Sequence, residues 1–263
     1  MMLMNHKKGR LPRALALALT CTVLLAVTVS AKSDNWYCVH EKDHRRPRAD
    51  ASLSYIEQYD GYYIGADEND KVIYLTFDAG YENGNVSKIL DVLKEKEVPA
   101  AFFVLSHLIE NDTALVERMF DEGHLVCNHT ARHKDMSGVT DKATFEAELK
   151  ALETVCLEKT DRQMAKYYRP PEGKFSESNL RHAKELGYQT IFWSFAYADW
   201  DNQKQMNVEQ AKQKILSNIH AGEVMLLHPT SATNAAILGE VIDECRMQGY
   251  RFGTLHELTK TTR

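Results

Sequence analysis

The sequence predicts an α/β fold in which a parallel β-sheet is covered by helices. From Lys71 onward, short apolar runs rich in β-branched and aromatic residues alternate with longer amphipathic stretches. This alternation is typical of parallel strands joined by helical crossovers. With 263 residues, of which 44% are hydrophobic, the chain is long enough for one sizeable α/β domain and too short for two large domains plus an export signal.

The expected elements follow one another in a regular order. We expect strands over residues 72–77, 100–105, 125–127, 189–193 and 224–227. We expect helices over residues 86–97, 114–120, 142–157, 178–186, 208–219 and 234–247. In barrels and in open parallel sheets alike, functional groups gather at the carboxyl ends of the strands. Polar residues that follow a predicted strand are therefore the candidates for a site.

The N-terminus predicts export. Basic residues precede an uncharged, largely apolar run from Ala14 to Val29, and the small residues Ser30 and Ala31 follow it. As a helix this run would span about 24 Å, less than the ~30 Å hydrocarbon core of a membrane. We expect residues 1–31 to be a signal peptide cleaved after Ala31, with an uncleaved anchor as the alternative. The protein is then secreted or held in the cell envelope, and the export signal is its sole contact with the membrane.

The mature chain is expected to consist of an N-terminal arm and a catalytic domain. Residues 32–70 are polar and dotted with aromatics, without strong periodicity, and we interpret them as a linker or surface arm ahead of a domain over 71–263. The formal net charge of −5 provides no basic field, which excludes nucleic acid as a partner. For the mature cysteines, buried free thiols are at least as well supported as a disulfide; these are Cys38, Cys127, Cys156 and Cys245.

Two histidines follow the strand predicted to end at Cys127. His129 and His133 are four residues apart, and on a helical turn this spacing places both imidazoles on one side, where they suit one divalent cation. Such a pair also arises on ordinary helix surfaces. Alone, therefore, it is weak support for a metal site.

A carboxylate and a guanidinium are candidates for a second interaction. Asp78 ends the first apolar strand and is followed by small residues that leave room for a ligand. Arg169 precedes two prolines, a stiff segment that could direct its guanidinium toward Asp78. Taken separately, the Asp is also typical of a turn and the Arg of a rigid surface turn.

A carboxylate–imidazole pair completes the set. Asp199 lies just beyond an aromatic strand, and His228 ends the strand over 224–227. An Asp partner favours the imidazolium form and makes His228 a competent proton donor. Either residue alone is more typical of a structural role.

In this order, over residues 71–258, the motifs resemble those of the polysaccharide deacetylase (NodB-homology) family, carbohydrate esterase family 4. The matching segments are Thr76-Phe77-Asp78, His129-Thr130-x-x-His133, Arg169-Pro170-Pro171, Asp199-Trp200 and Leu226-x-His228. The resemblance implies a distorted (β/α) barrel with fewer than eight full repeats. It also implies hydrolysis of an acetamide on a glycan.

The resemblance assigns the first half of the chemistry to four residues. His129 and His133 would hold a divalent metal, with Zn²⁺ the first candidate, that binds a water and the acetyl oxygen. Asp78 would take the proton of that water. Arg169 would orient Asp78 and keep it ionised.

The second half falls to residues around the acetyl group. The backbone N–H of Glu172 would help to stabilise the oxyanion, and His228, held by Asp199, would protonate the leaving amine. Trp200 and Leu226 would wall the acetyl pocket.

Ala79 is the first departure from the family pattern, because most members have a second Asp there that completes the metal's protein ligands. Two histidines plus water, or plus Asp78, should bind a metal more weakly, which leaves the metal's identity open. Glu82 is close enough in sequence to substitute, although a surface position is favoured for it.

The substrate is expected to be peptidoglycan. The segment from Thr76 to Gly84 resembles that of the muramic-acid deacetylases involved in making the spore-cortex δ-lactam, which implies deacetylation of N-acetylmuramic acid in peptide-free strands. Glu172 is the second departure, because a carboxylate there would not favour the lactyl anion, and it keeps N-acetylglucosamine in peptidoglycan or chitin-like oligomers as an alternative. A non-catalytic wall-binding protein that lost the metal through Ala79 is the alternative from another class.

Overall fold

The computed structural model describes residues 32–39, 41 and 43–260. The expected signal peptide, residues 1–31, lies outside these residues. Within them, no helix is both long and apolar enough to cross a membrane.

A parallel sheet forms the centre of the molecule. Its strands are ordered β11 (Glu223–Leu227), β5 (Val72–Ala79), β6 (Ala101–Val104), β7 (Leu125–Asn128), β8 (Ala165–Tyr168), β10 (Gln189–Ile191) and β4 (Gly61–Tyr62). The short β12 (Arg251–Phe252) also pairs with β5. Each strand lies parallel to its neighbours in this sheet. The parallel sheet expected from the alternating sequence pattern is confirmed.

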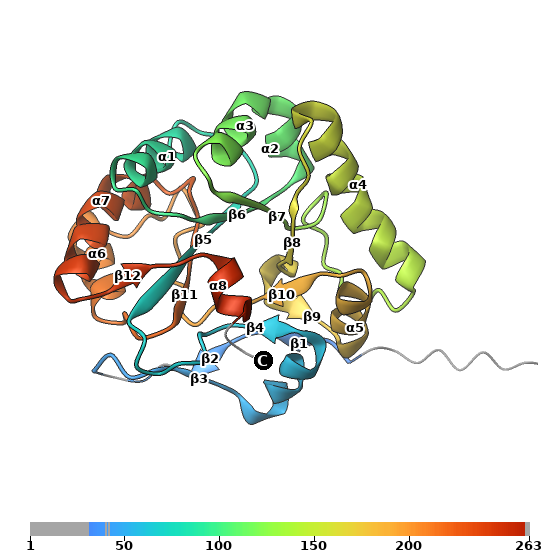
Figure 1. Ribbon diagram of the computed structural model, residues 1–263, viewed down its shortest axis with the longest axis horizontal. Helices are drawn as coiled ribbons and strands as arrows, with labels where there is room; N and C mark the ends of the chain where they lie inside the picture. Colours follow the sequence, from blue (N-terminus) through green and yellow to red (C-terminus); the bar gives the residue numbers. More distant parts are fainter. Residues whose placement is uncertain (1–31, 40, 42, 261–263) are drawn as a thin grey trace, which may run out of the picture.

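The sheet is curled so strongly that its two ends meet. Two isolated bridges, from Ile64 to Glu223 and from Phe195 to Met225, connect the β4–β10 end to β11 at the other end. In Figure 1 most of the helices lie around the outside of this curled sheet, and the last one, near the C-terminus, lies within it. The expected distorted (β/α) barrel with fewer than eight repeats is confirmed.

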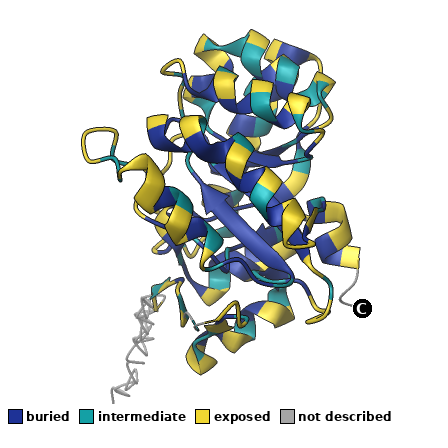
Figure 2. Cartoon of the chain, turned by 90° about the vertical axis from the view of Figure 1, so that its left-hand side faces the viewer, coloured by how far each residue is buried: buried dark blue, intermediate teal, exposed yellow. Residues whose placement is uncertain are grey.

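Seven of the described helices cover the outer face of the sheet: α1 (Val86–Glu95), α2 (Ser106–Asn111), α3 (Thr113–Asp121), α4 (Lys142–Thr160), α5 (Glu177–Glu185), α6 (Val208–Leu216) and α7 (Ala232–Met247). The last described helix, α8 (Leu255–Lys260), packs through Leu255 and Leu258 on the inner face of the sheet. Figure 2 shows buried strands behind helices whose outward faces are exposed. All five predicted strands and all six predicted helices are present, within a few residues of their expected ends.

Strand β5 shows why its sequence predicted a strand. Ile73, Leu75 and Phe77 pack in the large apolar cluster beneath the helices, whereas Val72 and Tyr74 pack in a second cluster on the opposite face. A strand buried on both faces gives a continuous apolar run in the sequence. By the same alternation, Asp78 shares the face of Tyr74, so the strand places its carboxylate on the inner face of the curled sheet.

The predicted arm, as far as it is described, packs against the domain. β1 (Asp34–Asn35) pairs with β9 (Lys174–Phe175), β2 (Cys38–Val39) pairs with β3 (Arg48–Ala49), and a 3₁₀-helix covers Ala51–Tyr59. Trp36 is buried and stacks on Phe192 at 4.5 Å between ring centroids. Because β4 belongs to the main sheet, the sheet begins before residue 71, where we placed the start of the domain. The four cysteines among the described residues, Cys38, Cys127, Cys156 and Cys245, are free thiols.

Candidate active site

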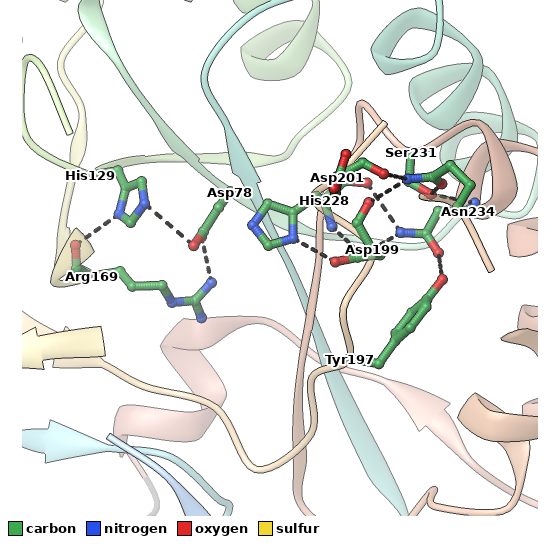
Figure 3. A network of polar contacts seen from close by, with 10 residues as sticks. Asp78, His129, Arg169, Tyr197, Asp199, Asp201, His228, Ser231 and Asn234 are labelled. Carbon is green, nitrogen blue, oxygen red and sulfur yellow. Dashed lines mark hydrogen bonds and ion pairs between the residues drawn. The ribbon is translucent and has the colours of Figure 1, made fainter. Parts of the chain in front are cut away.

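The carboxyl ends of the strands bring the predicted site residues together. Asp78 lies near the end of β5, His129 and Arg169 directly follow β7 and β8, and His228 directly follows β11. Asp199 lies in the loop after β10. Figure 3 shows these five side chains converging. They adjoin a cavity of about 640 Å³, lined by Asp78, Gly80, Tyr81, Leu105, His129, His133, Glu172, Trp193, Ala196, Tyr197, Trp200, Leu226, His228 and Thr230.

Asp78 and Arg169 form a buried ion pair. Arg169 is fully buried, and its Nη1 donates to Asp78 Oδ1 at 2.8 Å. Its Nη2 donates to Thr76 Oγ1 at 2.9 Å and its Nε to the Ile191 carbonyl at 3.0 Å, so the guanidinium is fixed from three sides. Burial by itself would raise the pKa of Asp78, but the neighbouring imidazoles and the Arg169 guanidinium outweigh it, and the pKa lies below its usual 3.8. The carboxylate is therefore ionised at neutral pH.

His129 has a defined tautomer. Its Nδ1 lies 2.9 Å from the Arg169 carbonyl oxygen, which can only accept, so Nδ1 carries the proton and Nε2 presents a lone pair. Nε2 lies 3.4 Å from Asp78 Oδ2. Burial lowers the pKa of His129 to about 4, which keeps the ring neutral at physiological pH. A neutral imidazole whose other nitrogen is held by a carbonyl is the form that binds metals.

His133 reaches the same place by a different route from the one predicted. The segment after Asn128 is not helical, because Thr130 and His133 have left-handed backbone conformations, with φ of 69° and 54°. The helical turn expected from the four-residue spacing is therefore wrong. The two turns nevertheless bring the imidazole rings of His129 and His133 to 4.9 Å between centroids. The buried Asn128 side chain stabilises this loop by accepting a hydrogen bond from the Thr130 N–H at 2.9 Å.

The donor atoms available to a metal are few. Across residues 32–39, 41 and 43–260, no cluster of three or more His, Cys, Asp or Glu side chains is arranged to hold a metal ion. Ala79 is buried in the apolar cluster beneath the helices and has no ligand atom. Glu82 accepts a hydrogen bond from the Gly84 N–H of its own loop and is not among the cavity-lining residues. The residues present thus fit a divalent cation held by the two imidazoles, with Asp78 beside them.

Asp199 and His228 form the second pair. Asp199 Oδ1 accepts from His228 Nδ1 at 2.7 Å, and Oδ2 accepts from the His228 backbone N–H at 2.8 Å. Burial would lower the pKa of His228, but its hydrogen bond to Asp199 and the charge of that carboxylate outweigh the effect and raise the pKa above its usual 6.5. With Nδ1 bound to Asp199, Nε2 is the nitrogen on the Asp78 side in Figure 3.

The sequence did not reveal the residues that hold these pairs in place. Asn234 donates to Asp199 Oδ2 at 2.6 Å and accepts a hydrogen bond from the Tyr197 hydroxyl. Gln205 donates to the Asp199 carbonyl at 2.9 Å. Asn234 lies in the first turn of α7, where an amide suggests no more than helix capping. Its role depends on the packing of α7 beside the loop after β10.

The three residues predicted to contact substrate all line the cavity. Leu226 is buried, whereas Trp200 is 63% exposed. Glu172 has a left-handed backbone with φ of 57°, and its half-exposed carboxylate pairs with Lys174 Nζ at 2.7 Å. The negative charge that we expected to oppose an anionic substrate is therefore compensated by a lysine two residues away.

Comparisons with known proteins show which family the chain resembles in sequence and in fold. A sequence model described as polysaccharide deacetylase matches residues 65–191. Peptidoglycan-N-acetylmuramic acid deacetylase PdaA of Bacillus subtilis is 40% identical over 225 residues, 85% of each chain. A peptidoglycan-N-acetylglucosamine deacetylase of Bacillus cereus is 31% identical, over 73% of this chain and 90% of that protein. The solved structure of Bacillus subtilis PdaA, described as a family 4 carbohydrate esterase, superposes with a TM-score of 0.84 and 38% identity, over 88% of this chain and 99% of that one.

Proposed function

The chain belongs to the polysaccharide deacetylase family, carbohydrate esterase family 4, and from this we propose that it removes the acetyl group from N-acetylmuramic acid in peptidoglycan. The observation that supports the proposed chemistry is the presence of two residue pairs beside one cavity, one of which favours an ionised carboxylate and the other a protonated imidazole. Arg169 keeps Asp78 ionised, and Asp199 favours protonated His228. A base and an acid with separated pKa values are what amide hydrolysis requires.

The residues of the chain supply the proton transfers. Asp78 accepts the proton of the attacking water. His228, oriented by Asp199 through Nδ1, donates its Nε2 proton to the amine nitrogen as the C–N bond breaks. The products are acetate and a free amine on the sugar. The backbone N–H of Glu172, in the cavity wall, is proposed to stabilise the oxyanion.

We propose His129 and His133 as the ligands of a divalent metal, with zinc the first candidate. Imidazole nitrogens suit this borderline cation. When bound, the metal would polarise the acetyl carbonyl and activate water. Because the chain offers two imidazoles rather than three protein ligands, we expect weaker retention of the metal than in a three-ligand site.

Identity supports the muramic substrate, because the chain matches the muramic-acid deacetylase at 40% and the glucosamine deacetylase at 31%. The lactyl carboxylate of muramic acid would meet a Glu172 that is already paired with Lys174. N-acetylglucosamine stays the alternative substrate, since the Glu172–Lys174 pair has no net positive charge that would attract the lactyl carboxylate. A non-catalytic wall-binding protein would not need the acid–base set of Asp78, Arg169, Asp199 and His228.

The proposal places the protein outside the cytoplasmic membrane, where peptidoglycan lies. The basic start and apolar run of residues 1–31 support export through a signal peptide or an uncleaved anchor. Mass spectrometry of the protein recovered from the cell envelope would show a mature N-terminus at Lys32 if the signal is cleaved. Recovery of full-length protein from the cytosol alone would contradict export.

Acetyl loss from defined glycans tests the function. We would incubate the mature protein with peptide-free peptidoglycan strands and with N-acetylglucosamine oligomers, each with zinc, with other divalent ions and with chelator, and measure the products by mass spectrometry. Metal-dependent loss on muramic residues supports the proposal. Loss from glucosamine alone would favour the alternative substrate, and no loss with any metal would favour wall binding without catalysis.

Two substitutions test the assigned roles. Asp78→Asn removes the base and His228→Ala removes the acid, and each should lower kcat by roughly 10²–10⁴-fold. Circular dichroism spectra and thermal unfolding should show that each variant is folded. Near-normal turnover in either folded variant would contradict the role of that residue.

A further inference from the structure

Two large aromatic side chains remain exposed beside the catalytic pairs. Tyr81 is 42% exposed and Trp200 is 63% exposed, and both line the cavity that contains Asp78 and His228. The other large apolar side chains that are exposed among the described residues do not line this cavity; they are Tyr37, Val39, Leu157, Val208 and Met247. Exposed aromatics gathered at a cavity indicate a binding surface.

The loop that carries Tyr81 is fixed in place. Asn202 Nδ2 donates to the Tyr81 hydroxyl at 2.6 Å, which connects the loop after β5 to the loop after β10. Asn83 and Asn85 donate to the Thr230 carbonyl at 2.8 and 3.1 Å, which connects the same loop to the segment after β11. Tyr81 is therefore exposed while the position of its hydroxyl and of its loop is already set.

Such a fixed, exposed ring suits binding. A side chain held before the ligand arrives loses little conformational freedom on binding. The ring of Tyr81 offers a flat apolar face, and its hydroxyl, which accepts from Asn202, still has its own proton to donate. A pyranose ring has the complementary surfaces, an apolar C–H face and a rim of hydroxyl groups.

We propose that Tyr81, positioned by Asn202, forms a subsite for a sugar ring adjacent to the one that is deacetylated. This inference rests on the proposed function and deepens it, because it predicts that substrate affinity increases with glycan length. Tyr81 lies three residues beyond Asp78, on the loop that follows β5, and lines the same cavity as Asp78 and His228, so a glycan bound over the two catalytic residues can extend onto its ring. Asn202 acts through Tyr81 as a positioning residue.

Substrate length provides the test. We would measure kcat and KM on peptide-free peptidoglycan oligosaccharides, from the shortest oligomer that is deacetylated to strands several disaccharides long. Tyr81→Ala should raise KM on long strands by about tenfold, the size expected for one aromatic contact, and change the shortest substrate little. Asn202→Ala should act in the same direction by a smaller factor.

A matched variant controls for the loss of an exposed aromatic ring. Tyr37 is 50% exposed and does not line the cavity, so Tyr37→Ala should behave as wild type at every length. Loss of activity in Tyr81→Ala by the same factor at all lengths, or no loss at any length, would overturn the subsite. Thermal unfolding should show that all three variants are folded.

Binding separates this inference from the proposed function. Isothermal titration calorimetry of the same oligosaccharides should show that affinity rises with length for wild type and that this gain is lost in Tyr81→Ala. If wild type binds but deacetylates no substrate, the proposed function fails and the length dependence of binding still decides the subsite. Binding that is independent of length in wild type, or that is absent, overturns the subsite.

Discussion

Arg169 shows how one buried side chain can define a site. Its guanidinium donates to Asp78, Thr76 and the Ile191 carbonyl, and its own carbonyl accepts from His129. The same residue therefore sets the charge of the proposed base and the tautomer of a proposed metal ligand. The planar fork of arginine makes such simultaneous contacts, which a lysine cannot reproduce.

Removing this guanidinium should cost stability as well as activity. Arg169→Met leaves Asp78 buried beside no fixed cation, and loss of one partner of a buried pair typically costs about 3–5 kcal/mol. Urea unfolding would measure the change. As a control, Arg162→Met breaks an exposed pair with Asp121 and should cost no more than ~1 kcal/mol. Equal losses in the two variants would show that the buried pair contributes nothing special.

The pKa of His228 predicts the alkaline limb of activity. The proposed acid must be protonated, and Asp199 raises its pKa above 6.5, so kcat/KM should fall as pH rises through that raised value. Asp199→Asn removes the anion and should move the limb to lower pH. The stabilisation from the charged pair should likewise be full below about 6.5 and disappear as pH rises through the raised pKa. A limb that stays in place in Asp199→Asn would assign it to another group.

At the scale of elements, the sequence was most informative where burial is symmetric. Strand β5 reads as a strand because both of its faces are buried. Strand β8, which is followed directly by Arg169, was missed because an exposed lysine interrupts the apolar pattern of Ala165–Tyr168. The left-handed backbone conformation of His133 could also not be predicted from the local sequence, since no glycine occupies that position. The order of the motifs nonetheless predicted Arg169 and His133 as site residues. The roles of Asn234 and Tyr197 could not be predicted, because they arise from contacts between segments that are distant in the sequence.

The loop of Glu172 offers a prediction at this scale. Gly173 has φ of 67°, and a Cβ there would lie 2.7 Å from Trp193, a cavity-lining ring, and 3.2 Å from the buried Trp36. Gly173→Ala should therefore lower activity and cost more than the ~1–2 kcal/mol of a left-handed alanine. Gly123→Ala is the matched control, because φ is 82° and nothing lies within 4 Å. Thermal unfolding and kcat/KM would compare them, and similar effects would exclude the clash as a cause.

At the scale of the whole molecule, Glu223 lies at the junction where the sheet closes. Its side chain is fully buried, it bridges Ile64, and burial raises its pKa well above 4.5. The folded state therefore favours the protonated form, and its stability should fall as pH rises above the unfolded value of about 4.5 toward the raised one. Glu223→Gln should remove this dependence and stabilise the protein at neutral pH, as urea unfolding at pH 5 and pH 8 would show. A variant less stable than wild type at both pH values would contradict this.

The neighbouring positions of β5 and β11 have a consequence for when the protein becomes active. Thr76 donates to the Met225 carbonyl across 149 residues of chain, and these two strands carry the proposed base and acid. In a chain that emerges from a membrane N-terminus first, Asp78 emerges early, long before the segment that contains His228. If the chain is exported as we propose, catalysis can begin only when β11 pairs with β5, so partly translocated chains would leave the cell wall unmodified.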